Sequence, residues 1–263
     1  MMSLEMPQAI RAFEILLGWS LLVQSAEYLK VHALDRVSHW GIQGAEVPHA
    51  RVRQALDCLY QPLPYRCLLG LRALLSIALM LGLAGPGSAI VLFAMALVLL
   101  LRWRGAFNGG SDFMTLVGLT GLLLAHALGP FTSAETAWHV ALWYVTVHSL
   151  SSYFVSGWVK LMRPEWRSGR ALTVFLDNGV YGPLPARSIF RSPRLALLCS
   201  WSFTVWEGLF PLALLDVRLA ALFCATAAAF HFMVFWFFGL NRFFWAWLST
   251  FPAILYCASQ GIA

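Results

Sequence analysis

The sequence has little charge for its length. Of its 263 residues 11% are charged and 60% are hydrophobic, and the mean hydropathy is +0.71. A surface that faces water needs about 25–35% charged residues, so this composition excludes a soluble monomer. No polar stretch is long enough for a separate soluble domain. We therefore expect residues 1–263 to form a single domain within a membrane.

The sequence also lacks the usual signatures of disulfide, metal and phosphate sites. The five cysteines are an odd number and no two have the spacing of a CxxC motif, so neither a disulfide framework nor a zinc site is predicted. There is no glycine-rich phosphate loop and no GxSxG nucleophile motif. His126 and His148 lie in apolar runs with no second ligand one helical turn away, so we predict no metal site. The excess of positive charge is read as a topology signal, and no nucleic-acid partner is expected.

What the sequence does contain is a series of long apolar runs, which predict an all-α polytopic bundle of about eight transmembrane helices. Each run has about the 20 residues that a bilayer crossing needs, and in lipid only helices satisfy the backbone of a single segment. Residues 30–65 mix charged and apolar side chains, as helices in the headgroup layer do. The first run contains Glu14 and Glu27 and is predicted to span rather than to be a signal peptide. The predicted spans are residues 8–29, 66–84, 87–103, 112–129, 137–161, 195–215, 219–239 and 243–259.

Basic residues concentrate in the connections on one side of this predicted bundle. With Arg72 set aside inside a span, fifteen of the 18 lie after the first, third, fifth and seventh spans, and Arg11 and Arg218 lie on the other side. Cytoplasmic loops are enriched in Lys and Arg, so the pattern predicts outer termini and a cytoplasmic 160–194 connection. Seven of the fifteen lie in that connection, where they could serve a site instead of topology.

Lysine is nearly absent, and one of the two lysines, Lys160, stands at the end of the fifth predicted span. A buried ammonium can lose its proton, whereas a guanidinium stays charged. At 100° per residue Tyr153, Ser156 and Gly157 share a face with Lys160, and this polar stripe is predicted to face the bundle interior. Two interpretations stay open: Lys160 is a base in a dry cavity, or it is an anchor at the headgroups beside Trp166.

Other polar residues inside predicted spans are candidates for the same site, because each is expensive to bury without a partner. Glu207 and His231 could form a hydrogen-bonded pair, either within a site or as a structural pair that fixes helix register. Asp112 could be a helix N-cap or the counter-ion of Lys160. Arg242 is interpreted as an interfacial anchor.

The segment around Lys160 and a later aromatic segment carry a family resemblance. The run YFVSGWVKL at 153–161, followed by Trp166, matches the pattern Tyr-Phe-x-x-Gly-x-x-Lys-Leu and a following Trp. The run FHFMVFWFFGLNRF at 230–243 matches the pattern Phe-His-x-Met, with His231 and Met233 in register. Both patterns are typical of the horizontally transferred transmembrane (HTTM) family, which includes vitamin K-dependent gamma-carboxylase, and the chain resembles that family over about residues 103–255.

The resemblance implies a chemistry, and the expected site combines the residues of the matching motifs with the buried polar residues named above. In the carboxylase, the lysine that matches Lys160 is the base that deprotonates vitamin K hydroquinone, so a reduced quinone is the cofactor that the resemblance suggests. The run NGGSDFMTL at 108–116 resembles a compact bacterial branch, which implies a bacterial cytoplasmic membrane. Gly110 stands where the family has histidine, and no counterpart of the large extramembrane domain is present, so we expect no peptide carboxylation. The expected catalytic residues are Lys160, His231, Glu207 and Asp112, and the expected cofactor-binding residues are Asn108, Ser111, Tyr153, Gly157, Trp166 and Met233.

Two classes of function follow from these residues. The first is an intramembrane site for a hydrophobic quinone or lipid, in which Lys160 acts as a base. The second is a non-catalytic membrane subunit that binds a protein partner through the arginine-rich 163–194 connection. Replacing Lys160 by arginine separates them, because an anchor keeps its charge and a base is lost.

Overall fold

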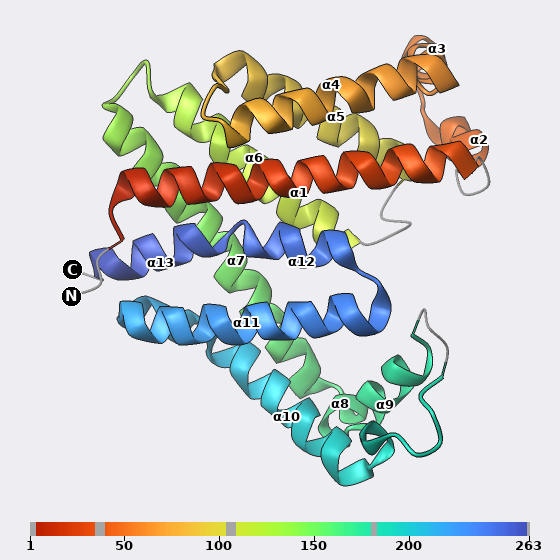
Figure 1. Ribbon diagram of the computed structural model, residues 1–263, viewed down its shortest axis with the longest axis vertical. Helices are drawn as coiled ribbons and strands as arrows, with labels where there is room; N and C mark the ends of the chain where they lie inside the picture. The colour runs from red at the N-terminus through yellow and green to blue at the C-terminus, as the bar shows by residue number, and fades with distance from the viewer. Residues whose placement is uncertain (1–3, 35–39, 104–108, 180–182, 262–263) are drawn as a thin grey trace.

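The protein is all-helical throughout the part of the chain that the computed structural model describes, residues 4–34, 40–103, 109–179 and 183–261 (Figure 1). Six helical segments are long and apolar enough to cross a membrane, which fits the integral membrane protein that the composition predicts. They are Met6–Val31, Pro62–Met80, Pro86–Trp103, Gly110–Leu128, Pro193–Leu215 and Val217–Phe238.

Long helices alternate with short ones along the chain. The long helices and their continuations are α1 (Met6–Leu34), α4 (Pro62–Met80), α5 (Pro86–Trp103), α6 (Gly109–Leu128), α7 (Ala134–Met162), α10 (Pro193–Leu209) with η3 (Phe210–Leu215), α11 (Val217–Phe238), α12 (Asn241–Leu248) and α13 (Phe251–Gln260). The short elements are α2 (Trp40–Gln43), η1 (Gly44–Glu46), α3 (Ala50–Leu59), α8 (Pro164–Arg167), α9 (Arg170–Asp177) and η2 (Ile189–Arg191).

Helix α7 joins the two halves of the bundle. It packs against α6 on the N-terminal side and against α10 and α13 on the C-terminal side, while α1 packs against α4, α12 and α13. In Figure 1 the chain termini lie together at one end, and α2, α3, α8 and α9 lie at the opposite end. The arginine-rich 163–194 connection therefore shares an end of the molecule with α2 and α3.

Local sequence sets where the long helices begin and end. The hydroxyl of Ser133 accepts the backbone N–H of Thr136 at the start of α7, and the carboxylate of Asp216 accepts the N–H of Arg218 at the start of α11. Gly239 ends α11 with a φ of 67°, a conformation that suits glycine. The apolar runs and these caps together explain the helix boundaries.

The prediction of one continuous helix over residues 243–259 was wrong. The chain breaks between α12 and α13, where Ser249 and Thr250 are fully buried and Pro252 lies in the first turn of α13. The hydroxyls of Ser249 and Thr250 donate to the carbonyls of Ala246 and Trp247, so backbone acceptors at the break keep partners inside the protein.

Candidate functional site

Lys160 forms an ion pair with Glu207 where α7 meets α10. The Lys160 Nζ atom donates to Glu207 Oε2 at 2.5 Å and to Ser156 Oγ at 2.6 Å, and it lies 5.1 Å from the centre of a Trp166 ring. The side chains of Lys160 and Glu207 are 13% and 4% exposed. The amine therefore turns into the protein, with a carboxylate as its counter-ion, although it stands near the end of a long helix as an anchor would.

Tyr153 and His231 form a second buried pair close to the first. The Tyr153 hydroxyl and His231 Nε2 lie 2.6 Å apart, and the Tyr153 ring stacks on Phe210 with ring centres 4.0 Å apart. Tyr153 stands seven residues before Lys160 on α7, about 10 Å along the helix axis and on the same face. The Lys160 side chain bends back to Ser156, one turn closer to Tyr153, so the two pairs lie along one polar seam of α7.

These contacts correct two predicted pairings. Glu207 and His231 are not hydrogen-bonded to each other, because Glu207 binds Lys160 and His231 binds Tyr153. Asp112 is not the counter-ion of Lys160, since its Oδ1 lies 3.9 Å from Arg242 Nη1 in a different part of the bundle. The sequence alone could not resolve these pairings, because they depend on how α7, α10 and α11 rotate against each other.

Three buried ring nitrogens surround Tyr153 without a hydrogen-bond partner among the described residues. They are His231 Nδ1, Trp206 Nε1 and Trp247 Nε1. The rings of Trp206 and Trp247 lie 5.4 and 4.6 Å from that of Tyr153, and the ring of His231 lies 5.8 Å away. Most buried polar atoms in proteins are hydrogen-bonded, so such a group calls for an explanation. The sequence gives no signal for it, since tryptophan in a membrane helix usually serves packing.

Gly157, an expected ligand contact, instead sets the approach of α7 to α10. A Cβ atom placed on Gly157 would lie 2.4 Å from the backbone N of Gly208, so the two backbones touch at this crossing. This close approach brings Glu207, next to Gly208, within reach of Lys160. Trp166, another expected contact, lies over the Lys160 amine, because the turn after α7 folds α8 back onto α10.

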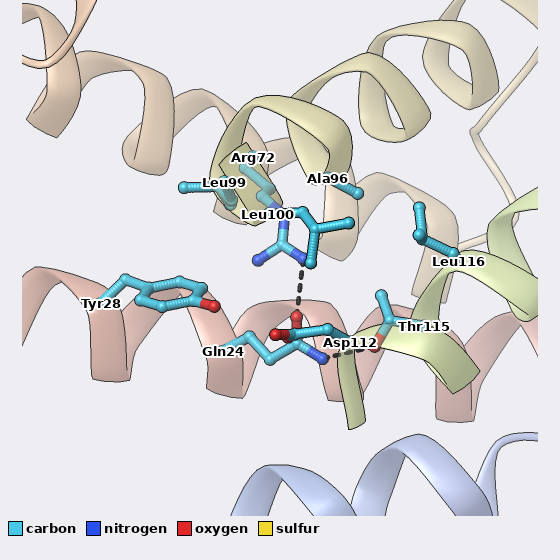
Figure 2. Close-up of a pocket in the computed structure, with 9 residues that line it drawn as sticks. All are labelled: Gln24, Tyr28, Arg72, Ala96, Leu99, Leu100, Asp112, Thr115 and Leu116. Carbon is cyan, nitrogen blue, oxygen red and sulfur yellow. Dashed lines mark hydrogen bonds between the residues drawn. The ribbon is translucent and has the colours of Figure 1, made fainter. Parts of the chain in front are cut away.

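Asp112 belongs to a second polar cluster, shown in Figure 2, and Ser111 joins it through its carbonyl, which accepts a hydrogen bond from Thr115. It gathers side chains of α1, α4 and α6 around the fully buried Arg72, whose Nη2 donates to Gln24 Oε1 at 2.9 Å. Gln24 Nε2 in turn donates to Thr115 Oγ1 at 2.7 Å, and Ser111 is fully buried nearby on α6. The crevice between them encloses about 10 Å³, room for about one water molecule. Arg72 was set aside in the sequence, although a charge in mid-span is itself a signal of such a network.

Arg242, interpreted from the sequence as an interfacial anchor, is buried and pairs with carboxylates of this second cluster and of α1. Its side chain is 7% exposed, and its Nε lies 3.1 Å from Glu27 Oε2. Asn241 Nδ2 donates to the same Glu27 carboxylate at 2.9 Å, so the start of α12 is fastened to α1. The next residue of α12, Phe243, lies 5.0 Å from the His231 ring, so α12 contacts both polar clusters.

One expected cofactor-binding residue, Met233, joins neither cluster. Met233 is 40% exposed and lines an apolar pocket between α9, α10 and α11. Asn108 lies outside the described residues. Of the ten expected site residues, the structure brings together Lys160, Glu207, Tyr153, His231, Gly157 and Trp166.

The arrangement offers proton donors and acceptors in a dry setting. Within the described residues no three His, Cys, Asp or Glu side chains come together as metal ligands. Comparison of this chain with protein-family models, with curated proteins and with solved structures finds no match.

Proposed function

We propose that this integral membrane protein crosses the bilayer about eight times and carries a site for a lipid-soluble ligand around Tyr153. The observation that carries the proposal is the group of three buried ring nitrogens without partners. If the Tyr153 hydroxyl is the donor of the hydrogen bond to His231 Nε2, the neutral imidazole carries its own proton on Nδ1. All three nitrogens are then N–H donors, and an oxygen-bearing headgroup such as that of a quinone or quinol supplies the acceptors.

The Lys160–Glu207 pair would supply the proton acceptor of this site. Because the amine donates directly to the carboxylate, one proton can pass from Lys160 to Glu207, which turns the ion pair into a neutral pair. The neutral amine of Lys160 then takes a proton from a hydroxyl of the ligand and becomes an ammonium, leaving an oxyanion on the ligand. Glu207 is the positioning partner, because it holds the amine against α10 and stores the first proton.

The sequence resemblance points to the same reaction class. The motifs around Lys160 and His231 resemble the HTTM family, in which the matching lysine deprotonates a reduced quinone, and we propose a reduced quinone as the ligand. Lys160, His231 and Tyr153 are the residues that carry this part of the proposal. Membership of that family, and a bacterial cytoplasmic membrane as the location, are proposed on the motifs alone.

A structural role for the same residues is the second candidate. The Lys160 amine is already held by Glu207, Ser156 and the Trp166 ring, as in an ion pair that fixes two helices and does no chemistry. The protein would then be a membrane subunit that meets a protein partner through residues 163–194.

Binding of a reduced quinone to the purified protein tests the first candidate. We expect ubiquinol-1 or a short-chain menaquinol to bind the wild-type protein in detergent. Tyr153→Phe should weaken binding by about 5- to 150-fold, because His231 is then no longer held with its proton on Nδ1 and the ligand loses a hydrogen bond of about 1–3 kcal/mol. Thr226→Val, which removes an exposed hydroxyl of α11, is the matched control.

Lys160→Arg separates the two candidates. Arginine keeps the ion pair with Glu207, so a structural subunit retains its folding and its thermal midpoint. A base is lost, because guanidinium does not give up its proton. The ultraviolet spectrum of the bound quinol reports whether it has lost a proton. If Lys160→Arg binds the quinol but does not deprotonate it, the first candidate is supported. Unchanged deprotonation in that variant, or no quinol binding by wild type, contradicts it.

A further inference from the structure

An apolar pocket lies between the short helix α9 and the long helices α10 and α11. Its volume is about 100 Å³, and every side chain that lines it is apolar. Helix α9 contributes Leu172 and Leu176, α10 contributes Phe203, and α11 contributes Val234 and Phe237. A pocket with no hydrogen-bonding side chain suits a hydrocarbon chain and not a polar headgroup.

The helix that covers this pocket is held in place by specific contacts. Gly169, with a φ of 76°, turns the chain into α9 so closely against α10 that a Cβ there would lie 2.7 Å from the backbone N of Leu197. At the other end of α9, Asp177 pairs with Arg191 at 2.9 Å, and Arg191 Nε also donates to the Pro185 carbonyl at 3.1 Å. Helix α9, which forms one wall of the pocket, is therefore fastened at both ends.

The segment that contributes Leu172, Leu176 and Phe190 to the pocket is rich in exposed arginines. Arg170 is the first residue of α9, two positions before Leu172, and Arg194 is in the first turn of α10, five positions before the pocket residue Cys199. The described residues of the 163–194 segment expose one carboxylate, that of Glu165. The exposed arginines are Arg163, Arg167, Arg170, Arg187 and Arg194.

We propose that this pocket holds a segment of one acyl chain of an anionic phospholipid, whose phosphate is bound by Arg170 and Arg194. The apolar lining of the pocket accommodates the hydrocarbon chain, and the exposed arginines attract a negatively charged headgroup. Helix α9, with leucines on the pocket side and Arg170 at its start, is the element that joins the two parts. The proposal stands independently of the chemistry around Tyr153.

Native mass spectrometry of the delipidated protein in detergent tests this site with two probes, phosphatidylglycerol and phosphatidylcholine of the same chains. We expect one phosphatidylglycerol to be retained per protein at roughly 25-fold lower lipid concentration than phosphatidylcholine, because each of the two arginines near the headgroup contributes about fivefold. Val234→Trp fills the pocket and removes this lipid. Leu222→Trp, at a 63% exposed position of the same helix, is the matched control and keeps it.

Two double variants test whether Arg170 and Arg194 bind the headgroup. Arg170→Gln with Arg194→Gln makes the two lipids bind equally, whereas Arg51→Gln with Arg66→Gln, which removes two exposed arginines of α3 and α4, leaves the preference intact. Leu176→Trp repeats the filling test from α9 if Val234→Trp does not fold.

Three outcomes overturn the proposal. The first is equal retention of phosphatidylglycerol by the filled and control variants. The second is a neutral isoprenoid in the pocket, seen as a co-purified mass that Val234→Trp removes and Leu222→Trp keeps. The third is a dimer mass that Val234→Trp alone abolishes, which would mean that a second copy of the chain occupies the pocket.

Discussion

The Lys160 amine is held by three neighbours of different kinds: a carboxylate, a hydroxyl and an aromatic ring. A charge inside a membrane protein is tolerated when it is paired and hydrogen-bonded, and Glu207 and Ser156 meet both conditions. The same contacts would let the proton move within the pair, so stability and chemistry depend on the same atoms. The free energy of unfolding of variants at Glu207 measures the contribution of the ion pair to stability, apart from any chemistry.

Removing one member of the buried ion pair should destabilise the fold strongly. We expect Glu207→Gln to lower the free energy of unfolding by about 3–5 kcal/mol, because it leaves the Lys160 ammonium without a counter-charge. Thermal or denaturant unfolding in detergent micelles measures this change. The double variant Lys160→Met with Glu207→Leu should recover most of the loss.

The half-exposed pair of Arg53 and Asp57 provides the control for this prediction. Its atoms lie 3.8 Å apart and its side chains are 48% and 46% exposed, so Arg53→Gln should change stability by less than about 1 kcal/mol. Equal losses in Glu207→Gln and Arg53→Gln would mean that the Lys160 pair is not buried as described.

Tyr153→Phe should also destabilise the protein, by about 1–3 kcal/mol, because the ring stays in place while His231 Nε2 loses its partner. Ser202→Ala removes an exposed hydroxyl of α10 that donates within its own helix, and we expect a change within about 0.5 kcal/mol. Unfolding of both variants in the same detergent gives the comparison. A stability of Tyr153→Phe equal to that of Ser202→Ala contradicts a buried Tyr153–His231 bond.

At the scale of the elements, the crossing of α7 and α10 positions the site. Gly157 lets the two backbones touch, and the crossing brings the polar face of α7 onto Glu207 and Thr204 of α10. The break between α12 and α13 acts on the other side of the site, because it places Trp247 against Tyr153 and Arg242 against Glu27. Two irregular features therefore decide where the polar side chains meet.

The two glycines of this crossing should respond differently to alanine. A Cβ on Gly157 meets the Gly208 backbone at 2.4 Å, so Gly157→Ala should cost about 1–3 kcal/mol and separate Lys160 from Glu207. A Cβ on Gly208 meets nothing within 4 Å, so Gly208→Ala should be neutral or stabilising by up to about 1 kcal/mol. Unfolding measurements on both variants decide the matter, and a reversed order would contradict the described rotation of α7 against α10.

At the scale of the whole molecule, the short helices divide the protein into two unlike ends. The end with α2, α3, α8 and α9 carries most of the arginines, and the termini lie at the other end (Figure 1). This asymmetry is the one that sets orientation in membranes, because cytoplasmic connections are rich in basic residues. The six helical segments that qualify as spans run between these two ends.

Labelling of introduced cysteines in intact cells should place the two ends on opposite sides of the membrane. We expect a membrane-impermeant maleimide to label Thr132→Cys, in the connection before α7, and to leave Ser168→Cys, in the connection after it, unlabelled until the cells are opened. A background in which Cys58, Cys67 and the partly exposed Cys199 are replaced by serine removes the accessible native thiols. The opposite pattern would reverse the orientation, and equal labelling would contradict a membrane crossing by α7.

The sequence by itself determined the helical class, the membrane setting and the position of nearly every long helix. These follow from one-dimensional quantities, namely the length and polarity of each run and the residues that cap helices. It also predicted that Tyr153, Ser156 and Lys160 share one face of a helix, since a 100° step needs only the local chain.

Tertiary structure alone decided which groups are partners. Lys160 meets Glu207, His231 meets Tyr153 and Asp112 meets Arg242, because these pairings depend on helix rotation and on backbone contact at Gly157. The break at Ser249 and Thr250 could likewise not be predicted from the sequence. The two hydroxyls donate to the carbonyls of Ala246 and Trp247 in place of backbone N–H groups, and this matters only where the segment is buried. Partners from distant segments are chosen by packing, and packing is not a property of any one segment.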